Sequence, residues 1–228
     1  MRKLQILASA FSAMALGAAM PTHANLLPNG SFEDIAGTWV EDSTAHGMMK
    51  LEWPSLDVLP GWRVRWPGRN VAWVRDANPY GASASDGSFH IDLTGTLDGP
   101  SFNGVVTAFD SVPGARYRLS FDLGVNNGPC GGVPCSGPVG VLLDVVGVLS
   151  QRFMDFAPGG AGQQWTTLQV DFTAVDTRTV LAFDGQQGQA YIGLDNVTVT
   201  AVPEAATWAL FGAGLGALAW RRRRATGR

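Results

Sequence analysis

The chain has few of the residues that most catalytic and nucleic-acid-binding sites require. Its 228 residues include only three histidines and two cysteines, and charged residues make up 15%. The middle of the chain has no cluster of lysine and arginine, which argues against nucleic acid as a partner. The GxSxG, HExxH and phosphate-binding-loop motifs are also missing. These gaps favour a function other than catalysis.

The composition is that of a folded protein rich in turns. Hydrophobic residues make up 46% of the chain and the net charge is only -3, which excludes a disordered chain. The 29 glycines and 13 prolines are scattered, which excludes collagen and favours short strands joined by turns. The length allows one domain or two.

The N-terminus has the layout of a secretory signal. Arg2 and Lys3 precede an apolar run from Leu4 to Met20, and Pro21-Thr22-His23-Ala24 follows. We predict a signal peptide over residues 1–24, cleaved after Ala24. The alternative is a retained N-terminal anchor.

The C-terminus has an apolar segment followed by a basic cluster. Ala205 to Trp220 carries no charge, and Arg221-Arg222-Arg223-Arg224 comes directly after it. At about 1.5 Å per residue this segment spans roughly 24 Å as a helix, so flanking residues would complete a membrane span of about 30 Å. We predict a transmembrane helix over 205–220, with the arginines on the cytoplasmic side.

Val202, Pro203 and Glu204 precede this segment, and the three features together resemble a PEP-CTERM sorting signal over residues 202–228. Ala205 stands where that family has a second proline. The resemblance implies a Gram-negative bacterium, recognition by an exosortase in the inner membrane, and release or transfer to the cell surface. Without both ends, residues 25–203 hold nine Lys/Arg and eighteen Asp/Glu, a net charge of −9. Such a surface repels anionic membranes and nucleic acids.

The middle of the chain predicts one all-β domain, a β-sandwich over residues 25–201. Apolar residues alternate with polar ones over 116–123, 168–173 and 192–200, as in strands with one buried face. Further strands are expected at 62–65, 71–74, 88–93, 105–109, 139–148 and 179–183. Many short strands and no capped helical pattern indicate two packed antiparallel sheets. The longest irregular region expected is Asp34–Pro60.

Two cysteines lie close together in a glycine-rich segment. Cys130 and Cys135 occur in an exported chain, and an oxidising compartment favours a disulfide between them. A metal site is the weaker alternative, because no histidine lies nearby.

Several short motifs in fixed order resemble the DUF642 and choice-of-anchor C families. They are residues 25–33 (NLLPNGSFE), 59–62 (LPGW), 85–95 (SDGSFHIDLTG), 112–122 (VPGARYRLSFD) and 194–199 (LDNVTV). Both families are similar to the galactose-binding-like jelly rolls of carbohydrate-binding modules. The resemblance implies a jelly roll that associates with cell-wall or extracellular polysaccharide, without catalytic activity.

Acidic residues in these motifs are candidate calcium ligands. In related jelly rolls the first and last strands lie side by side, and acids there often share a structural Ca²⁺. This points to Glu33 and Asp195, with Asp34 and Asp86 as weaker candidates. The alternative is that these acids bond the backbone of their own turns.

Tryptophans crowd one part of the chain. Trp62 and Trp73 lie in expected strands, and we assign them to the core. Trp39, Trp53 and Trp66 lie in loop-like sequence, where either a core position or a sugar-binding position is open. The candidate ligand-binding residues are Trp39, Trp53, Trp66, Tyr80, Arg65 and Arg69.

The sequence therefore predicts an exported jelly-roll domain that binds extracellular polysaccharide without catalysis, in the envelope or biofilm matrix. One alternative is a structural surface adhesin that binds protein or itself through sheet edges. The other is a glycoside hydrolase with two carboxyl groups across a cleft.

Overall fold

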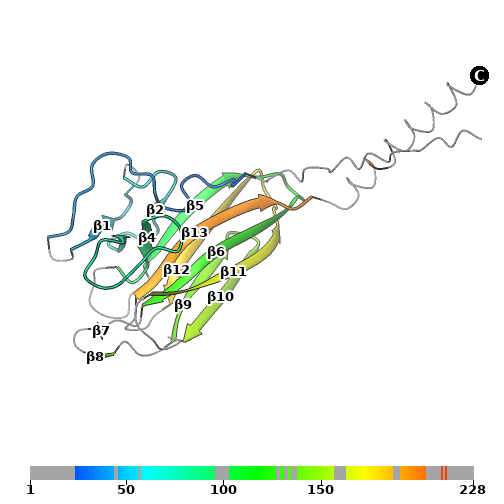
Figure 1. The fold of residues 1–228 in the computed structure, drawn as a ribbon. Helices are drawn as coiled ribbons and strands as arrows, with labels where there is room; N and C mark the ends of the chain where they lie inside the picture. Colours follow the sequence, from blue (N-terminus) through cyan, green and yellow to red (C-terminus); the bar gives the residue numbers. More distant parts are fainter. Residues whose placement is uncertain are drawn as a thin grey trace, which may run out of the picture.

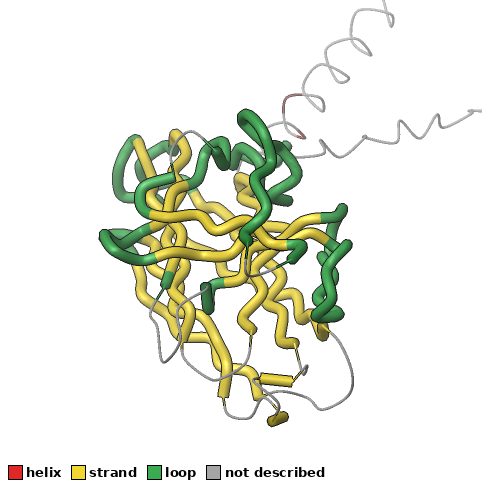
Figure 2. The backbone as a smooth tube through the Cα atoms, turned by 90° about the vertical axis from the view of Figure 1, so that its left-hand side faces the viewer, coloured by secondary structure: helices red, strands yellow, loops and turns green. Residues whose placement is uncertain are grey.

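Two antiparallel sheets pack face to face in the computed structural model (Figure 1, and Figure 2 after a 90° turn). The structure describes residues 24–203 apart from 44–45, 56–57, 96–102, 127–128, 131–132, 135–137, 157–162 and 187–190, together with Gly212 and Gly214. Within this part, the arrangement is the predicted jelly-roll β-sandwich.

The larger sheet has the order β1 (Met48–Glu52), β3 (Asn70–Arg75), β4 (Phe89–Asp92), β13 (Tyr191–Ala201), β6 (Arg116–Asn126), β11 (Gln163–Thr173). The other has the order β10 (Leu149–Phe156), β9 (Pro138–Val145), β12 (Arg178–Gln186), β5 (Gly104–Asp110), β2 (Arg63–Val64). A small ribbon pairs β7 (Pro129–Cys130) with β8 (Val133–Pro134). We call the first two the six-stranded and the five-stranded sheet.

The core lies between the inner faces of these two sheets. On β6, alternate residues from Tyr117 to Val125 are at most 4% exposed, as the period-two pattern predicts. Leu181 and Phe183 of β12 face them from the other sheet and are fully buried. Trp62 and Trp73 are also buried, which confirms their assignment to the core.

The N-terminal segment runs beside the last strand, β13. The Leu26 amide donates to the carbonyl oxygen of Val199 at 2.9 Å, and the Val197 amide donates to the Gly30 carbonyl oxygen at 2.8 Å. A Cβ on Gly30 would lie 1.9 Å from the Val197 carbonyl oxygen, so the close approach requires glycine there.

The outer face of the six-stranded sheet is partly covered by the loop between β3 and β4. Ala82 of this loop is 5% exposed and packs in a second apolar cluster with Met48 and Val74. Ser83 accepts a hydrogen bond at its carbonyl oxygen from the Trp165 indole of β11 at 2.9 Å. The loop between β3 and β4 therefore covers part of this face.

The predicted strands are present, but the prediction of an irregular region over Asp34–Pro60 is wrong because β1 lies inside it. The strand β10 was also not predicted. The predicted signal peptide falls outside the described residues, apart from Ala24. In the described part of the chain no helix is long and apolar enough to cross a membrane. The predicted helix 205–220 lies outside that part, apart from Gly212 and Gly214.

The predicted disulfide is not tested either. Cys130 ends β7, opposite Val133 of β8, but Cys135 lies outside the described residues. A disulfide between Cys130 and Cys135 stays a prediction.

Candidate functional site

The edge strand β2 and the residue after it place two arginines on the outer face of the five-stranded sheet, one of them the candidate Arg65. The Arg65 amide donates to the Gly104 carbonyl oxygen of β5 at 2.8 Å, so sheet pairing continues one residue past β2. Val64 points into the core and is 1% exposed. Side chains alternate along a strand, so Arg63 and Arg65 point to the outer face.

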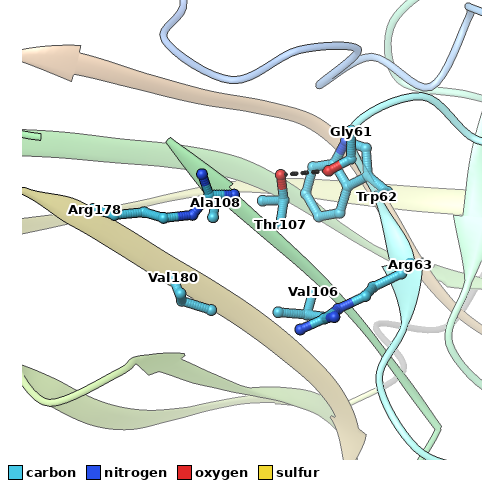
Figure 3. A pocket seen from close by; sticks show the side chains of 8 residues that line it. All are labelled: Gly61, Trp62, Arg63, Val106, Thr107, Ala108, Arg178 and Val180. Carbon is cyan, nitrogen blue, oxygen red and sulfur yellow. Dashed lines mark hydrogen bonds between the residues drawn. The ribbon is translucent and has the colours of Figure 1, made fainter. Parts of the chain in front are cut away.

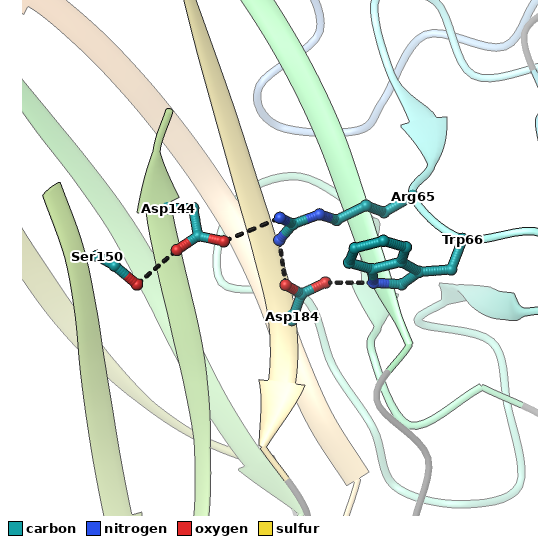
Figure 4. A network of polar contacts seen from close by, with 5 residues as sticks. All are labelled: Arg65, Trp66, Asp144, Ser150 and Asp184. Carbon is teal, nitrogen blue, oxygen red and sulfur yellow. Dashed lines mark hydrogen bonds and ion pairs between the residues drawn. The ribbon is translucent and has the colours of Figure 1, made fainter. Parts of the chain in front are cut away.

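Arg65 is the centre of a polar network on this face (Figure 4). Its guanidinium donates to a carboxylate oxygen of Asp184 on β12 and, at 2.9 Å, to Oδ2 of Asp144 on β9. Asp184 also accepts a hydrogen bond from the Trp66 indole at 3.0 Å, and Asp144 accepts one from the Ser150 hydroxyl at 2.5 Å. The Arg65 guanidinium therefore joins β12 and β9 directly, and β10 through Asp144, although these residues are far apart in the sequence.

The same network fixes the indole of Trp66. The Arg65 guanidinium carbon lies 4.6 Å from the centre of the Trp66 ring, a cation–π distance. The indole nitrogen is held by Asp184, yet the Trp66 residue is 43% exposed. The ring is thus held in one orientation while much of its surface faces solvent.

Burial and charge act against each other at Asp184. Its side chain is only 7% exposed, and burial raises the pKa of its carboxyl above the usual range. The positive charge of Arg65 opposes that rise. The ionised form of Asp184 therefore depends on Arg65, and the position of Trp66 depends on both.

Gly104 leaves the space that the Asp184 carboxylate occupies. A Cβ there would lie 2.2 Å from Asp184 Oδ1 and 2.6 Å from the Phe183 carbonyl oxygen. We expect Gly104→Ala to lower the free energy of unfolding by about 2 kcal/mol, because the added methyl overpacks the site. Urea denaturation measures the loss, and Trp fluorescence reports displacement of Trp66. A matched control is Gly147→Ala, where a Cβ meets nothing within 4 Å and only the positive φ adds a cost. Equal losses in stability and unchanged fluorescence would contradict the crowding argument.

Three of the predicted ligand-binding residues border one turn after β2. The Arg69 amide donates to the Trp66 carbonyl oxygen at 3.1 Å, and the Trp53 amide donates to the Arg69 carbonyl oxygen at 3.2 Å. Trp53 is 48% exposed. Beside it is a depression of about 260 Å³, lined by Lys50, Glu52, Trp53, Gly68, Arg69 and Asn70. The structure thus brings Trp53, Arg65, Trp66 and Arg69 to one edge of the sandwich.

The remaining two predicted residues lie elsewhere. The ring of Trp39 is 5.5 Å from that of Trp73 and 5.3 Å from that of Phe89, and it packs against the core. Tyr80 packs against the apolar cluster on the outer face of the six-stranded sheet, 6.3 Å from the ring of Tyr191. Neither residue belongs to the network around Arg65.

Backbone amides occupy the two main candidate calcium ligands. Glu33 Oε1 accepts hydrogen bonds from the Ser88 and Phe89 amides, both at 2.8 Å. Asp195 Oδ2 accepts hydrogen bonds from the Ser85 and Asp86 amides at 2.8 and 3.0 Å. Both acids therefore fasten one segment, the end of the loop between β3 and β4.

The weaker candidates, Asp34 and Asp86, are exposed. Among the described residues, no group of three or more His, Cys, Asp and Glu side chains is placed to hold a metal ion. The contacts of Glu33 and Asp195 fit their backbone donors better than a calcium ion. Structural Ca²⁺ at these residues stays a prediction.

Sequence reasoning missed Asp144 and Asp184, the acids that hold Arg65. Each is a lone acid in an apolar stretch, after Leu142-Leu143 and after Ala182-Phe183. Acidic residues are rarely buried without a partner, so a carboxylate inside a strand pattern was the signal that could have found them.

Residues 201–224 match the PEP-CTERM protein-sorting motif. This confirms the resemblance carried by Val202, Pro203, Glu204 and the arginine cluster. The motif indicates export and passage through a membrane-anchored stage. Comparison with curated protein sequences gives no match. The likeness to DUF642 proteins stays a resemblance.

Several solved structures are similar to this chain in part. One is TmCBM61 in complex with β-1,4-galactotriose, 16% identical, with 78% of this chain and 99% of that chain covered and a TM-score of 0.46. A second is the CBM22-1 xylan-binding domain from Paenibacillus barcinonensis, 16% identical, covering 69% and 94%, with a TM-score of 0.40. A third is the K1 cleaved adhesin domain of Lys-gingipain from Porphyromonas gingivalis W83, 16% identical, covering 68% and 99%, with a TM-score of 0.45. The ligands of these proteins do not identify the ligand of this chain.

Proposed function

We propose that the β-sandwich is an exported, non-catalytic domain that binds extracellular polysaccharide through the outer face of the five-stranded sheet. The observation that carries the proposal is Trp66, a residue that is 43% exposed while its indole nitrogen is held by Asp184. A large exposed aromatic side chain in a fixed orientation is typical of a binding surface.

The chemistry around Trp66 suits a sugar. A pyranose ring has an apolar face that can lie on an indole and a rim of hydroxyl groups that need hydrogen-bond partners. Arg65 and Asp184 lie directly beside the indole, and Asp144 accepts from Arg65 on the next strand. Because these groups are already ordered, a ligand loses little affinity to their immobilisation.

The chain's export fits a ligand outside the cell. The sorting motif at 201–224 supports export, with an exosortase as the processing partner and the inner membrane as a transient anchor. The domain would then act at the surface of a Gram-negative bacterium, in the envelope or the biofilm matrix.

Trp66→Ala tests the site. We expect at least a tenfold loss of affinity for the bound polysaccharide, because the variant removes a central, desolvated contact. Affinity electrophoresis of the full chain in mild detergent, against neutral and acidic polysaccharides, measures the loss. Tyr80→Ala deletes an aromatic ring that packs against the outer face of the six-stranded sheet, and it should leave affinity within about twofold, since it lies outside the proposed surface.

Unchanged affinity of a folded Trp66→Ala variant would contradict the proposed site. Retention that free glycan does not displace would contradict a sugar ligand and favour the surface adhesin. Release of soluble sugar from a bound polymer would contradict the non-catalytic assignment and favour the hydrolase.

A further inference from the structure

The basic residues of this acidic chain divide into paired and unpaired groups. Between 25 and 203 there are nine Lys/Arg and eighteen Asp/Glu. Five of the nine form ion pairs: Lys50, Arg65, Arg75, Arg116 and Arg118. Across the described residues, the other four form none: Arg63, Arg69, Arg152 and Arg178. In a segment with twice as many acids as bases, four unpaired arginines require an explanation.

Strand register places three of these four on one surface. Arg63 lies opposite Val106, Arg152 opposite Leu142, and Arg178 opposite Asp110. All three are exposed, whereas the residue that follows each of them, Val64, Phe153 and Thr179, is buried or packs against the core. The outer face of the five-stranded sheet therefore carries most of the unpaired positive charge.

Arg63 and Arg178 flank a depression of about 300 Å³ on this face (Figure 3). Figure 3 shows the two side chains reaching over it from opposite sides. Small and apolar residues of β5 and β12 line it between them: Val106, Ala108 and Val180. The acid across from Arg178 is Asp110, and the two form no ion pair. Two guanidinium groups thus face an apolar patch without a carboxylate partner.

We infer that this depression binds a carboxylate-bearing sugar unit, so that the polysaccharide is acidic. The inference rests on the proposed function and names the class of its ligand. A guanidinium presents paired donors that match a carboxylate, while the apolar residues between the arginines match the face of a sugar ring. The domain's overall negative charge repels polyanions at long range, so only a ligand that seats its acid group between these arginines gains from binding.

The test compares an acidic polymer with its neutral counterpart. The probes are polygalacturonate and the same polymer after carboxyl reduction, applied to the full chain in detergent. We expect the double variant Arg63→Gln, Arg178→Gln to lose at least about tenfold in affinity for polygalacturonate, because two charge-assisted contacts are removed. Its weaker affinity for the reduced polymer should change less than about twofold, since the reduced sugar offers no charge.

A matched control changes the same charge on the other sheet. The double variant Arg116→Gln, Arg118→Gln alters two arginines that pair with Asp171 on the outer face of the six-stranded sheet. Its affinity for polygalacturonate should stay within about twofold of the unaltered chain at 0.15 M salt, because distant charges are screened. Near-ultraviolet circular dichroism checks folding in every variant.

The other outcomes show whether the acidic ligand alone fails or polysaccharide binding fails with it. Equal, Trp66-dependent binding of both polymers would overturn the acidic ligand and keep polysaccharide binding. Binding of neither polymer, nor of any other in the panel, would overturn both. Dextran sulfate bound as tightly as polygalacturonate, with the same loss in the Arg63 and Arg178 variant, would show a general anion patch and overturn the carboxylate assignment.

Discussion

Replacing Arg65 with methionine is expected to lower the free energy of unfolding by about 3 kcal/mol. The substitution keeps most of the aliphatic stem but leaves Asp184 and Asp144 without their shared cation. Asp184 is the more costly of the two, because its side chain is 7% exposed against 22% for Asp144. A buried carboxylate without a counter-ion costs more than the ion pair itself contributes.

The loss should shrink as the pH falls. Burial already raises the pKa of Asp184, and removing Arg65 takes away the charge that opposes this rise. In the variant, Asp184 therefore binds a proton more readily in the folded state than in the unfolded chain. Protonation at acidic pH removes the buried charge, so the variant and the unaltered protein should approach each other in stability as the pH falls.

Urea denaturation at pH 7 and pH 4.5 measures both effects. Adding Asp184→Asn to Arg65→Met should recover more than half of the loss at pH 7, since it removes the buried charge. A matched control is Arg116→Met: the Arg116 side chain is 56% exposed and its guanidinium lies 3.5 Å from Asp171, so the loss should stay below about 0.5 kcal/mol. Equal losses for the Arg65 and Arg116 variants would show that the network around Arg65 stabilises the fold no more than an exposed ion pair does.

The strands were predictable where one face of the sheet is buried and the other is not. Over Arg116–Val125 the apolar side chains recur at every second residue, and every one of them faces the core. β1 shows no such pattern, because Met48 packs in the outer cluster while Met49 and Leu51 pack in the core. A strand buried on both faces within a proline- and glycine-containing segment has no period to reveal it.

The candidate site was only partly predictable, since its contacts join distant parts of the chain. Arg65 meets Asp144 79 residues later and Asp184 119 residues later. Trp39 and Trp66 lie in similar loop-like sequence, but only tertiary packing places one against Trp73 and leaves the other exposed. Local sequence could mark these tryptophans as unusual, but it could not separate a core ring from a surface ring.

The stability of the domain is expected to fall as the pH rises from about 4 to about 6. Burial raises the pKa of both Asp92 and Asp195 to about 6, so each holds a proton in the folded state that the unfolded chain has already released. Burial also lowers the pKa of His90 to about 4, so the unfolded chain binds its proton first, with the opposite effect on stability. On unfolding, the two carboxyl groups release more protons than the one imidazole takes up, so the net effect is a stability that falls as the pH rises.

Geometry near Asp195 supports this proton balance. Its Oδ2 lies 3.0 Å from the Ser85 hydroxyl, and Oδ2 of Asp122 lies 2.8 Å from the same hydroxyl. The hydroxyl has one proton and can donate to only one carboxylate, so the second contact is satisfied when a carboxyl is protonated. Asp122 and Asp195 also face each other across β6 and β13.

Urea denaturation between pH 4 and pH 7 gives the net proton difference. A difference of about one proton corresponds to about 1.4 kcal/mol of unfolding free energy per pH unit. His90→Gln removes the opposing group and should roughly double the slope, whereas Asp92→Asn removes one carboxyl and should bring it close to zero. A stability that rises with pH over this range would contradict the assignment, because it would mean that Asp92 and Asp195 are ionised in the fold and held there by partners.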